Sequence, residues 1–159
     1  MPPVIALFDD LRDLYQGVIL DHGRKPRNFR RLDNATHTAR GDNPMCGDRI
    51  ELFLAMGLQG NIDVATFQGR GCAISIASAS LMTEVIKGKS PGAARSMATA
   101  FRGLAMTGSC PVCDAASEDM ERLASLSGVH EFPSRVKCAT LAWHALAAAL
   151  DGAKEASSE

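Results

Sequence analysis

Hydrophobic residues along the chain follow two spacings, one typical of strands and one typical of helices. Alternation of apolar and polar side chains predicts strands at 49–56 and 62–66, joined by the turn GLQGN. A third, weaker strand is predicted at 36–42, directly before the glycine-bounded loop GDNPMCGD. These strands would form a small antiparallel sheet.

Apolar residues three or four positions apart predict helices before and after the strands. The first is expected over 5–22 and is ended by Gly23 and Pro26. The others are expected, in chain order, at 74–86, 91–106, 115–126 and 139–150. Strands followed by helices predict an α+β fold, with a small antiparallel three-stranded sheet and helices packed on one face. We expect one domain over 1–150 and a polar C-terminal tail over 151–159.

Composition narrows the function classes. The chain has 159 residues, 46% of them hydrophobic, which suits one globular domain without disulfide staples. Its 17 basic and 18 acidic residues, with one Trp and one Tyr, argue against nucleic acid as a partner. Its apolar stretches are shorter than the roughly 20 residues that span a bilayer, which argues against a membrane partner. Acidic residues near the N-terminus are unlike a signal peptide, so we expect a cytoplasmic protein.

The cysteines carry the strongest chemical signal. An odd number of cysteines without an export signal favours metal or thiol chemistry over disulfides, although an isolated cysteine can be a small buried hydrophobe. Cys72 and Cys138 are both expected immediately before a helix, where the helix dipole favours a thiolate. Arg70 and Lys137 lie close to them in sequence and add positive charge.

Cys46 lies in the glycine-bounded loop, two residues before Asp48. Together with Cys72 and Cys138 they make four ligands, the number that a tetrahedral zinc site requires. A carboxylate among thiolates is the ligand most easily displaced, so such a site can open. Spacing alone leaves scattered cysteines without a metal as an equal alternative, because no paired zinc knuckle is present.

Four sequence blocks occur in order and cover nearly the whole chain: LYQGVILDHGRKPRN, NPMCGD, GRGCAISIASASLMTE and RVKCATLAW. They resemble the signatures of the iron–sulfur cluster assembly scaffold family of the IscU/NifU type. The resemblance implies an α+β fold with a small antiparallel sheet. It also implies a metal site made of Cys46, Asp48, Cys72 and Cys138.

Departures from the family pattern indicate a branch. Lys137 stands where housekeeping IscU scaffolds have His, and EFPSRVK replaces their Leu-Pro-Pro-Val-Lys chaperone-recognition segment. The segment between 106 and 138, and the block RVKCATLAW, resemble the SufU branch instead. The resemblance implies a zinc-dependent sulfur acceptor that takes persulfide sulfur from a SufS-type cysteine desulfurase and supplies downstream iron–sulfur assembly proteins. A partner side chain, such as a desulfurase histidine, would release Cys46 to act as the catalytic residue that attacks the persulfide.

Two other functions remain open. A true scaffold would assemble a transient [2Fe–2S] cluster on the same four residues. Cys110 and Cys113 form a CxxC motif outside the family pattern, so a thiol oxidoreductase with a structural zinc is the third hypothesis. The remaining candidates are weaker: a lone loop histidine, His130, is a remote second-metal ligand, and His37 and His144 are interpreted as structural.

Overall fold

A four-stranded sheet forms where the sequence alternates apolar and polar residues. The computed structural model describes residues 17–44, 47–108 and 118–157. The strands lie in the order β3-β2-β1-β4, with β1 and β3 antiparallel to β2 and with β4 parallel to β1. Their bounds are β1 (His37–Asn43), β2 (Asp48–Met56), β3 (Ile62–Arg70) and β4 (Glu155–Ser157).

The central strand β2 shows why the alternation predicts the sheet correctly. Ile50, Leu52 and Leu54 are fully buried and lie on the same face of β2. The register places Ala39 of β1 and Phe67 of β3 on either side of Leu52, and both are buried as well. This row of apolar side chains is the sheet's contribution to the core.

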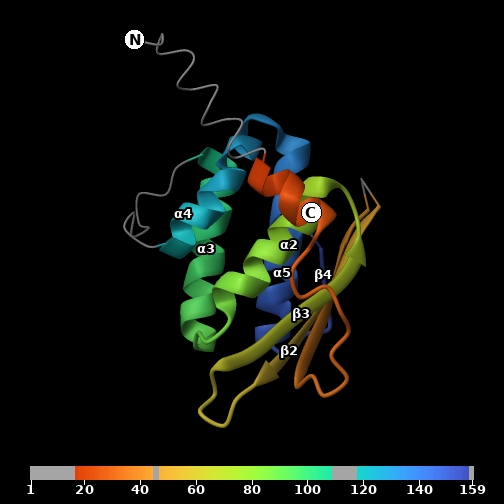
Figure 1. The fold of residues 1–159 in the computed structure, drawn as a ribbon, viewed down its shortest axis with the longest axis vertical. Coiled ribbons are helices and arrows are strands. Elements are labelled where there is room, and N and C mark those ends of the chain that lie inside the picture. The colour runs from red at the N-terminus through yellow and green to blue at the C-terminus, as the bar shows by residue number, and fades with distance from the viewer. Residues whose placement is uncertain (1–16, 45–46, 109–117, 158–159) are drawn as a thin grey trace.

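The helices gather on one side of the sheet (Figure 1). Residues 17–24 are helical, and a 3₁₀ segment over Ala124–Glu131 links the last two α-helices. The α-helices are α2 (Ala73–Ile86), α3 (Pro91–Thr107), α4 (Glu118–Leu123) and α5 (Pro133–Leu150). α2 packs against β3, while α5 packs against β1 and β2. The predicted α+β class, with helices on one face, is therefore confirmed.

Trp143 joins the three long helices. It is fully buried on α5, and its ring stacks on Phe101 of α3 with the centroids 4.7 Å apart. Its Nε1–H donates to the Ser78 hydroxyl of α2 over 3.1 Å. One aromatic side chain with a satisfied polar atom thus fixes α2, α3 and α5 relative to one another.

β1 and α5 approach each other closely at Gly41. A Cβ atom at this position would lie 3.1 Å from Leu141 Cδ1 and 3.2 Å from the Leu141 carbonyl oxygen. The absence of a side chain therefore lets α5 lie directly on β1. This contact lies one helical turn after Cys138 and fixes how deep that residue sits.

The sheet has four strands, not the predicted three, because β4 forms in the tail that was expected to fray. β4 pairs with β1, and Arg40 Nη2 donates to Glu155 Oε1 over 3.0 Å. A strand of three polar and small residues carries no periodic signal, which explains why the sequence did not reveal it. Within the described residues, no helix combines the length and the apolar character needed to cross a membrane.

A buried polar cluster ties the helix over 17–24 to α2. His22 is only 7% exposed, and its Nδ1 lies 2.7 Å from the Ser80 hydroxyl of α2. The Arg27 backbone N–H donates to the same hydroxyl over 2.8 Å. Burial, assisted by Arg27, lowers the pKa of His22, although Glu84 acts in the opposite direction. The neutral imidazole is therefore the form that the fold favours.

We predict that the protein loses stability as the pH falls below about 6.5, the pKa of an unperturbed histidine. Below this pH, His22 binds a proton in the unfolded chain but resists it in the folded protein. The free energy of unfolding therefore falls by up to about 1.4 kcal/mol per pH unit for this one proton. Urea unfolding between pH 7.5 and 5.5 measures this slope. His22→Gln should flatten it while leaving the share from His144, whose pKa is also lowered by burial. An unchanged slope in that variant would contradict the assignment to His22.

Candidate metal centre

Three of the four predicted ligands come together in the structure. One carboxylate oxygen of Asp48 and the sulfurs of Cys72 and Cys138 all lie within 4.8 Å of one another. They come from the first residue of β2, the residue before α2 and the second turn of α5. Asp48 and Cys138 are buried, and Cys72 is half-buried. Segments far apart in the sequence thus bring three candidate ligands together.

Cys46, the fourth predicted ligand, lies outside the described residues, as do Cys110 and Cys113. The chain on either side of Cys46 is described. Asn43 ends β1, and the Gly47 N–H donates to its carbonyl oxygen over 2.8 Å. Gly47 has a positive φ of 74°, a conformation that glycine adopts without strain.

Cys72 lies where the sequence predicts it, at the N-cap of α2. Its sulfur accepts a hydrogen bond from the Ser75 backbone N–H over 3.5 Å, which is a cap made by a cysteine in place of the usual oxygen side chain. The open N–H groups and the positive end of the helix dipole therefore face this sulfur.

Cys138 differs from the prediction. It does not precede the last helix, because α5 begins at Pro133 and Cys138 is its sixth residue. Its sulfur lies 3.5 Å from the Ser134 carbonyl oxygen one turn earlier, not at an open helix end. Burial raises the pKa of the Cys138 thiol, and Asp48 and Cys72 raise it further. The helix dipole therefore does not stabilise a thiolate here, and an added cation must do so.

The Asp48 carboxylate is held by the start of α2. Its Oδ1 accepts from the Cys72 N–H over 3.2 Å, and its Oδ2 accepts from the Ser75 hydroxyl over 3.0 Å. Gly71 leaves room for this arrangement, since a Cβ atom there would lie 2.8 Å from Asp48 Oδ1. Any other residue at position 71 would push the carboxylate or the loop away.

Arg135 supplies positive charge that sequence reasoning assigned to Arg70 and Lys137. It lies on the exposed first turn of α5, and its pKa is raised by Cys72 first and by Cys138 next. Arg135 and Cys138 are three residues apart on one helix, a spacing that puts side chains on the same face. This relation would have been visible in the sequence only if the start of α5 at Pro133 had been recognised.

The donor set fits zinc. Two cysteine sulfurs and one carboxylate are ligands that Zn²⁺ accepts, and three protein ligands leave one tetrahedral position for a fourth. The hydrogen bonds to Asp48 are the orienting contacts that metal-binding side chains usually have. Metal binding itself stays a prediction for these residues.

The other histidine candidates lie in different surroundings. His37 Nδ1 pairs with the neighbouring Thr36 hydroxyl over 2.9 Å, and His130 Nδ1 lies 2.8 Å from the Ser127 carbonyl oxygen. His144 lines a cavity of about 210 Å³ together with Arg102 and Trp143. In the described part of the chain, the metal-ligand group that contains Cys138 includes no histidine.

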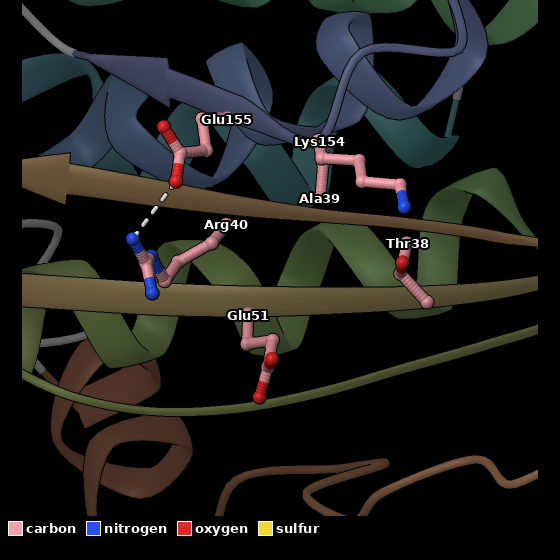
Figure 2. Close-up of a pocket in the computed structure, with 6 residues that line it drawn as sticks. All are labelled: Thr38, Ala39, Arg40, Glu51, Lys154 and Glu155. Carbon is pink, nitrogen blue, oxygen red and sulfur yellow. Dashed lines mark hydrogen bonds and ion pairs between the residues drawn. The ribbon is translucent and has the colours of Figure 1, made fainter.

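A second cavity, of about 230 Å³, lies on the strand side of the molecule. Figure 2 shows the Arg40–Glu155 ion pair at one end of it, and Thr38 and Lys154 at the other. Glu51 and Ala39 complete its lining. Asp48, Cys72 and Cys138 do not line this cavity, so it is separate from the candidate metal centre.

Known proteins match the chain over most of its length. The family model of the NifU-like N terminal domain matches residues 14–139. The zinc-dependent sulfurtransferase SufU of Bacillus subtilis (strain 168) is 46% identical over 138 residues, which cover 86% of this chain and 89% of that protein. The iron–sulfur cluster assembly scaffold protein IscU of Streptococcus pyogenes serotype M1 is 36% identical over 140 residues, which cover 88% of this chain and 84% of that protein.

Solved structures agree with the fold. A crystal structure described as a candidate iron–sulfur cluster assembly scaffold protein for the SUF system, from Fervidobacterium islandicum AW-1, superposes with a TM-score of 0.74 at 30% identity. The match covers 84% of this chain and 93% of that one. The N-terminal part of a NifU-like protein from Brucella abortus, at 18% identity and a TM-score of 0.76, supports the fold alone. The resemblance found in the sequence blocks is confirmed, and the chain belongs to the NifU-like N-terminal domain family.

Proposed function

We propose that this protein is a zinc-dependent sulfur acceptor that takes persulfide sulfur from a SufS-type cysteine desulfurase and passes it to downstream iron–sulfur assembly proteins. The observation that carries the proposal is the convergence of Asp48, Cys72 and Cys138 within 4.8 Å, in a chain that has a further cysteine two residues before Asp48. The named activity of the Bacillus subtilis relative supports the same function.

Cys46 is the residue to which we assign sulfur transfer. In the sequence, Cys46 stands two residues before Asp48. Asp48, Cys72 and Cys138 are each fixed by contacts of a strand or a helix, which suits holding a metal. Zinc, when bound, would keep the thiolates ionised while protecting them from oxidation.

The transfer step needs no external oxidant or reductant. The Cys46 thiolate attacks the outer sulfur of the desulfurase's cysteine persulfide and forms a new S–S bond. The S–S bond of the donor breaks, and its electron pair leaves with the donor cysteine as a thiolate. The sulfur then rests on Cys46 as a persulfide. We infer that this takes place in the cytoplasm, where thiols stay reduced.

Lys137 favours sulfur transfer over cluster assembly. Housekeeping scaffolds of the family have a histidine at this position, directly before the last cysteine, and this chain does not. The IscU name of the Streptococcus pyogenes relative favours the second candidate, a scaffold that assembles a [2Fe–2S] cluster on the same residues. The two functions differ in what the protein carries.

Native mass spectrometry of protein purified without oxygen separates the two functions. We predict one zinc ion per chain and no cluster, because three thiolates and one carboxylate complete a tetrahedral site. A two-iron, two-sulfur adduct on the intact chain would instead make the protein a scaffold. Lys137 would then be a substitution without functional meaning.

Cys46→Ala should abolish stimulation of the desulfurase while part of the zinc stays bound, because three ligands remain. Cysteine turnover by the desulfurase and the zinc content of the variant measure the two effects. Cys110→Ser combined with Cys113→Ser is the matched control and should leave stimulation intact. Loss of activity in that double variant would favour the CxxC oxidoreductase, and normal stimulation by Cys46→Ala would show that the acceptor assignment is wrong.

Arg135→Gln should weaken zinc binding about twofold to fivefold, the size of effect expected for an exposed ion pair. The guanidinium offsets part of the negative charge that the thiolates keep after a divalent ion has bound. Chelator competition at low and high salt measures the effect, which should shrink as salt screens it. Lys137→Gln is the comparison variant, and an equal or larger loss there would return the role to Lys137.

A further inference from the structure

Ser75 contacts all three residues of the described metal centre. It lies in the first turn of α2 and is fully buried. Its backbone N–H donates to the Cys72 sulfur, and its hydroxyl lies 3.0 Å from Asp48 Oδ2 and 3.2 Å from the Cys138 carbonyl oxygen. A hydroxyl buried among these residues can have one of two roles: it can link two helices by a hydrogen bond, or it can orient a candidate ligand.

Counting protons separates these two roles. A serine hydroxyl has one proton, so it can donate fully to Asp48 or to the Cys138 carbonyl, but not to both. The carboxylate is the stronger acceptor because it is charged, and it is also the nearer one. The Cys138 carbonyl lies inside α5, where a backbone N–H one turn later can serve it. Asp48 is therefore the acceptor that depends on the Ser75 hydroxyl.

The second carboxylate oxygen is held from the same helix turn. Asp48 Oδ1 accepts from the Cys72 N–H over 3.2 Å, and Ser75 takes Oδ2. Asp48 is carried by β2, but both of its oxygens are oriented by the first turn of α2. Two contacts at fixed positions on one rigid turn determine the plane of the carboxylate.

We propose that Ser75 is a positioning residue, whose hydroxyl holds the Asp48 carboxylate in the orientation that lets it serve as a metal ligand beside Cys72 and Cys138. The proposal rests on the zinc site of the proposed function. It assigns Ser75 no contact with the metal and no part in sulfur transfer. Ser75 acts only through Asp48.

Ser78 provides a matched control on the same helix. Its hydroxyl is also fully buried between α2 and α5, donates to the Ala139 carbonyl oxygen over 2.5 Å and accepts from Trp143. Among the described residues, Ser78 forms hydrogen bonds with Ala139 and Trp143, and not with Asp48, Cys72 or Cys138. Ser78→Ala therefore removes a buried helix-to-helix hydrogen bond of the same kind without touching Asp48.

A double-mutant cycle on zinc affinity tests the proposal. Chelator competition on the full chain compares Ser75→Ala, Asp48→Ala and the double variant with the unsubstituted protein. We expect Ser75→Ala to weaken zinc binding at least about tenfold, the usual effect of losing an orienting partner. In the Asp48→Ala background the same change should have almost no effect. Ser78→Ala should lower stability and leave zinc affinity unchanged.

A spectroscopic reading separates positioning from a general loosening of the site. In the cobalt-substituted protein, Ser75→Ala should change the ligand-field bands toward those of Asp48→Ala. The sulfur-to-cobalt charge-transfer band should keep its intensity, because both cysteines remain. Ser75→Thr keeps the hydroxyl, so its spectrum and zinc affinity should match those of the unsubstituted protein. This variant can be measured even if Ser75→Ala does not fold.

Three outcomes would overturn the proposal: an undiminished effect of Ser75→Ala without Asp48, an equal loss of zinc affinity in Ser78→Ala, or a loss of the charge-transfer band. Failure of the unsubstituted protein to bind zinc or cobalt would instead overturn the proposed function. Crystal structures of the metal-free protein then still test the positioning. The Asp48 carboxylate should turn away from the Cys72 N–H in Ser75→Ala, and an unmoved carboxylate would contradict the role of Ser75.

Discussion

The burial of the Asp48 carboxylate is the constraint on which the arrangement around the centre depends. A carboxylate that is only 4% exposed is unfavourable unless its oxygens receive hydrogen bonds. The Cys72 N–H and the Ser75 hydroxyl supply them, so the start of α2 must lie against the start of β2. Gly71 permits that approach because it has no side chain to meet the carboxylate. The local backbone of the loop before α2 follows from this one polar contact.

The third part of the centre is fixed by apolar packing. Cys138 lies close to Asp48 and Cys72 because α5 lies directly on β1 at Gly41 and is held to α2 and α3 by Trp143. These contacts surround α5 one to two turns after Cys138. Polar contacts therefore orient Asp48, and contacts of α5 with its neighbours fix the position of Cys138 beside it. A side chain at position 41, which would push α5 away from β1, is expected to move Cys138 relative to the other two candidate ligands.

The sequence is most informative where one face of an element is buried. The alternation around Leu52 predicts β2, and the apolar spacing from Ile74 to Ile86 predicts α2, because burial selects those residues directly. Where an element is exposed, burial does not determine its residue types, and the spacing of apolar residues does not predict that element. The first turn of α5 is exposed, so the apolar spacing does not reveal its start at Pro133 and predicts Cys138 at a helix end. β4 is short and polar, and it was missed for the same reason.

The candidate site was visible in the sequence as a set of residue types but not as an arrangement. The family blocks single out Cys46, Asp48, Cys72 and Cys138, yet nothing in their spacing says which ligand is oriented by which neighbour. Ser75 gives no such signal, because a serine at the start of a helix is common and its contacts with Asp48 and Cys138 span 27 and 63 residues.

The burial that hides Cys138 from solvent also raises the pKa of its thiol, whereas Cys72 lies at an open helix end. Binding a divalent cation at this site would require the proton of Cys138 to leave, which would make metal affinity depend on pH. In the proposed function the fourth ligand is Cys46, the residue that leaves the metal to accept sulfur.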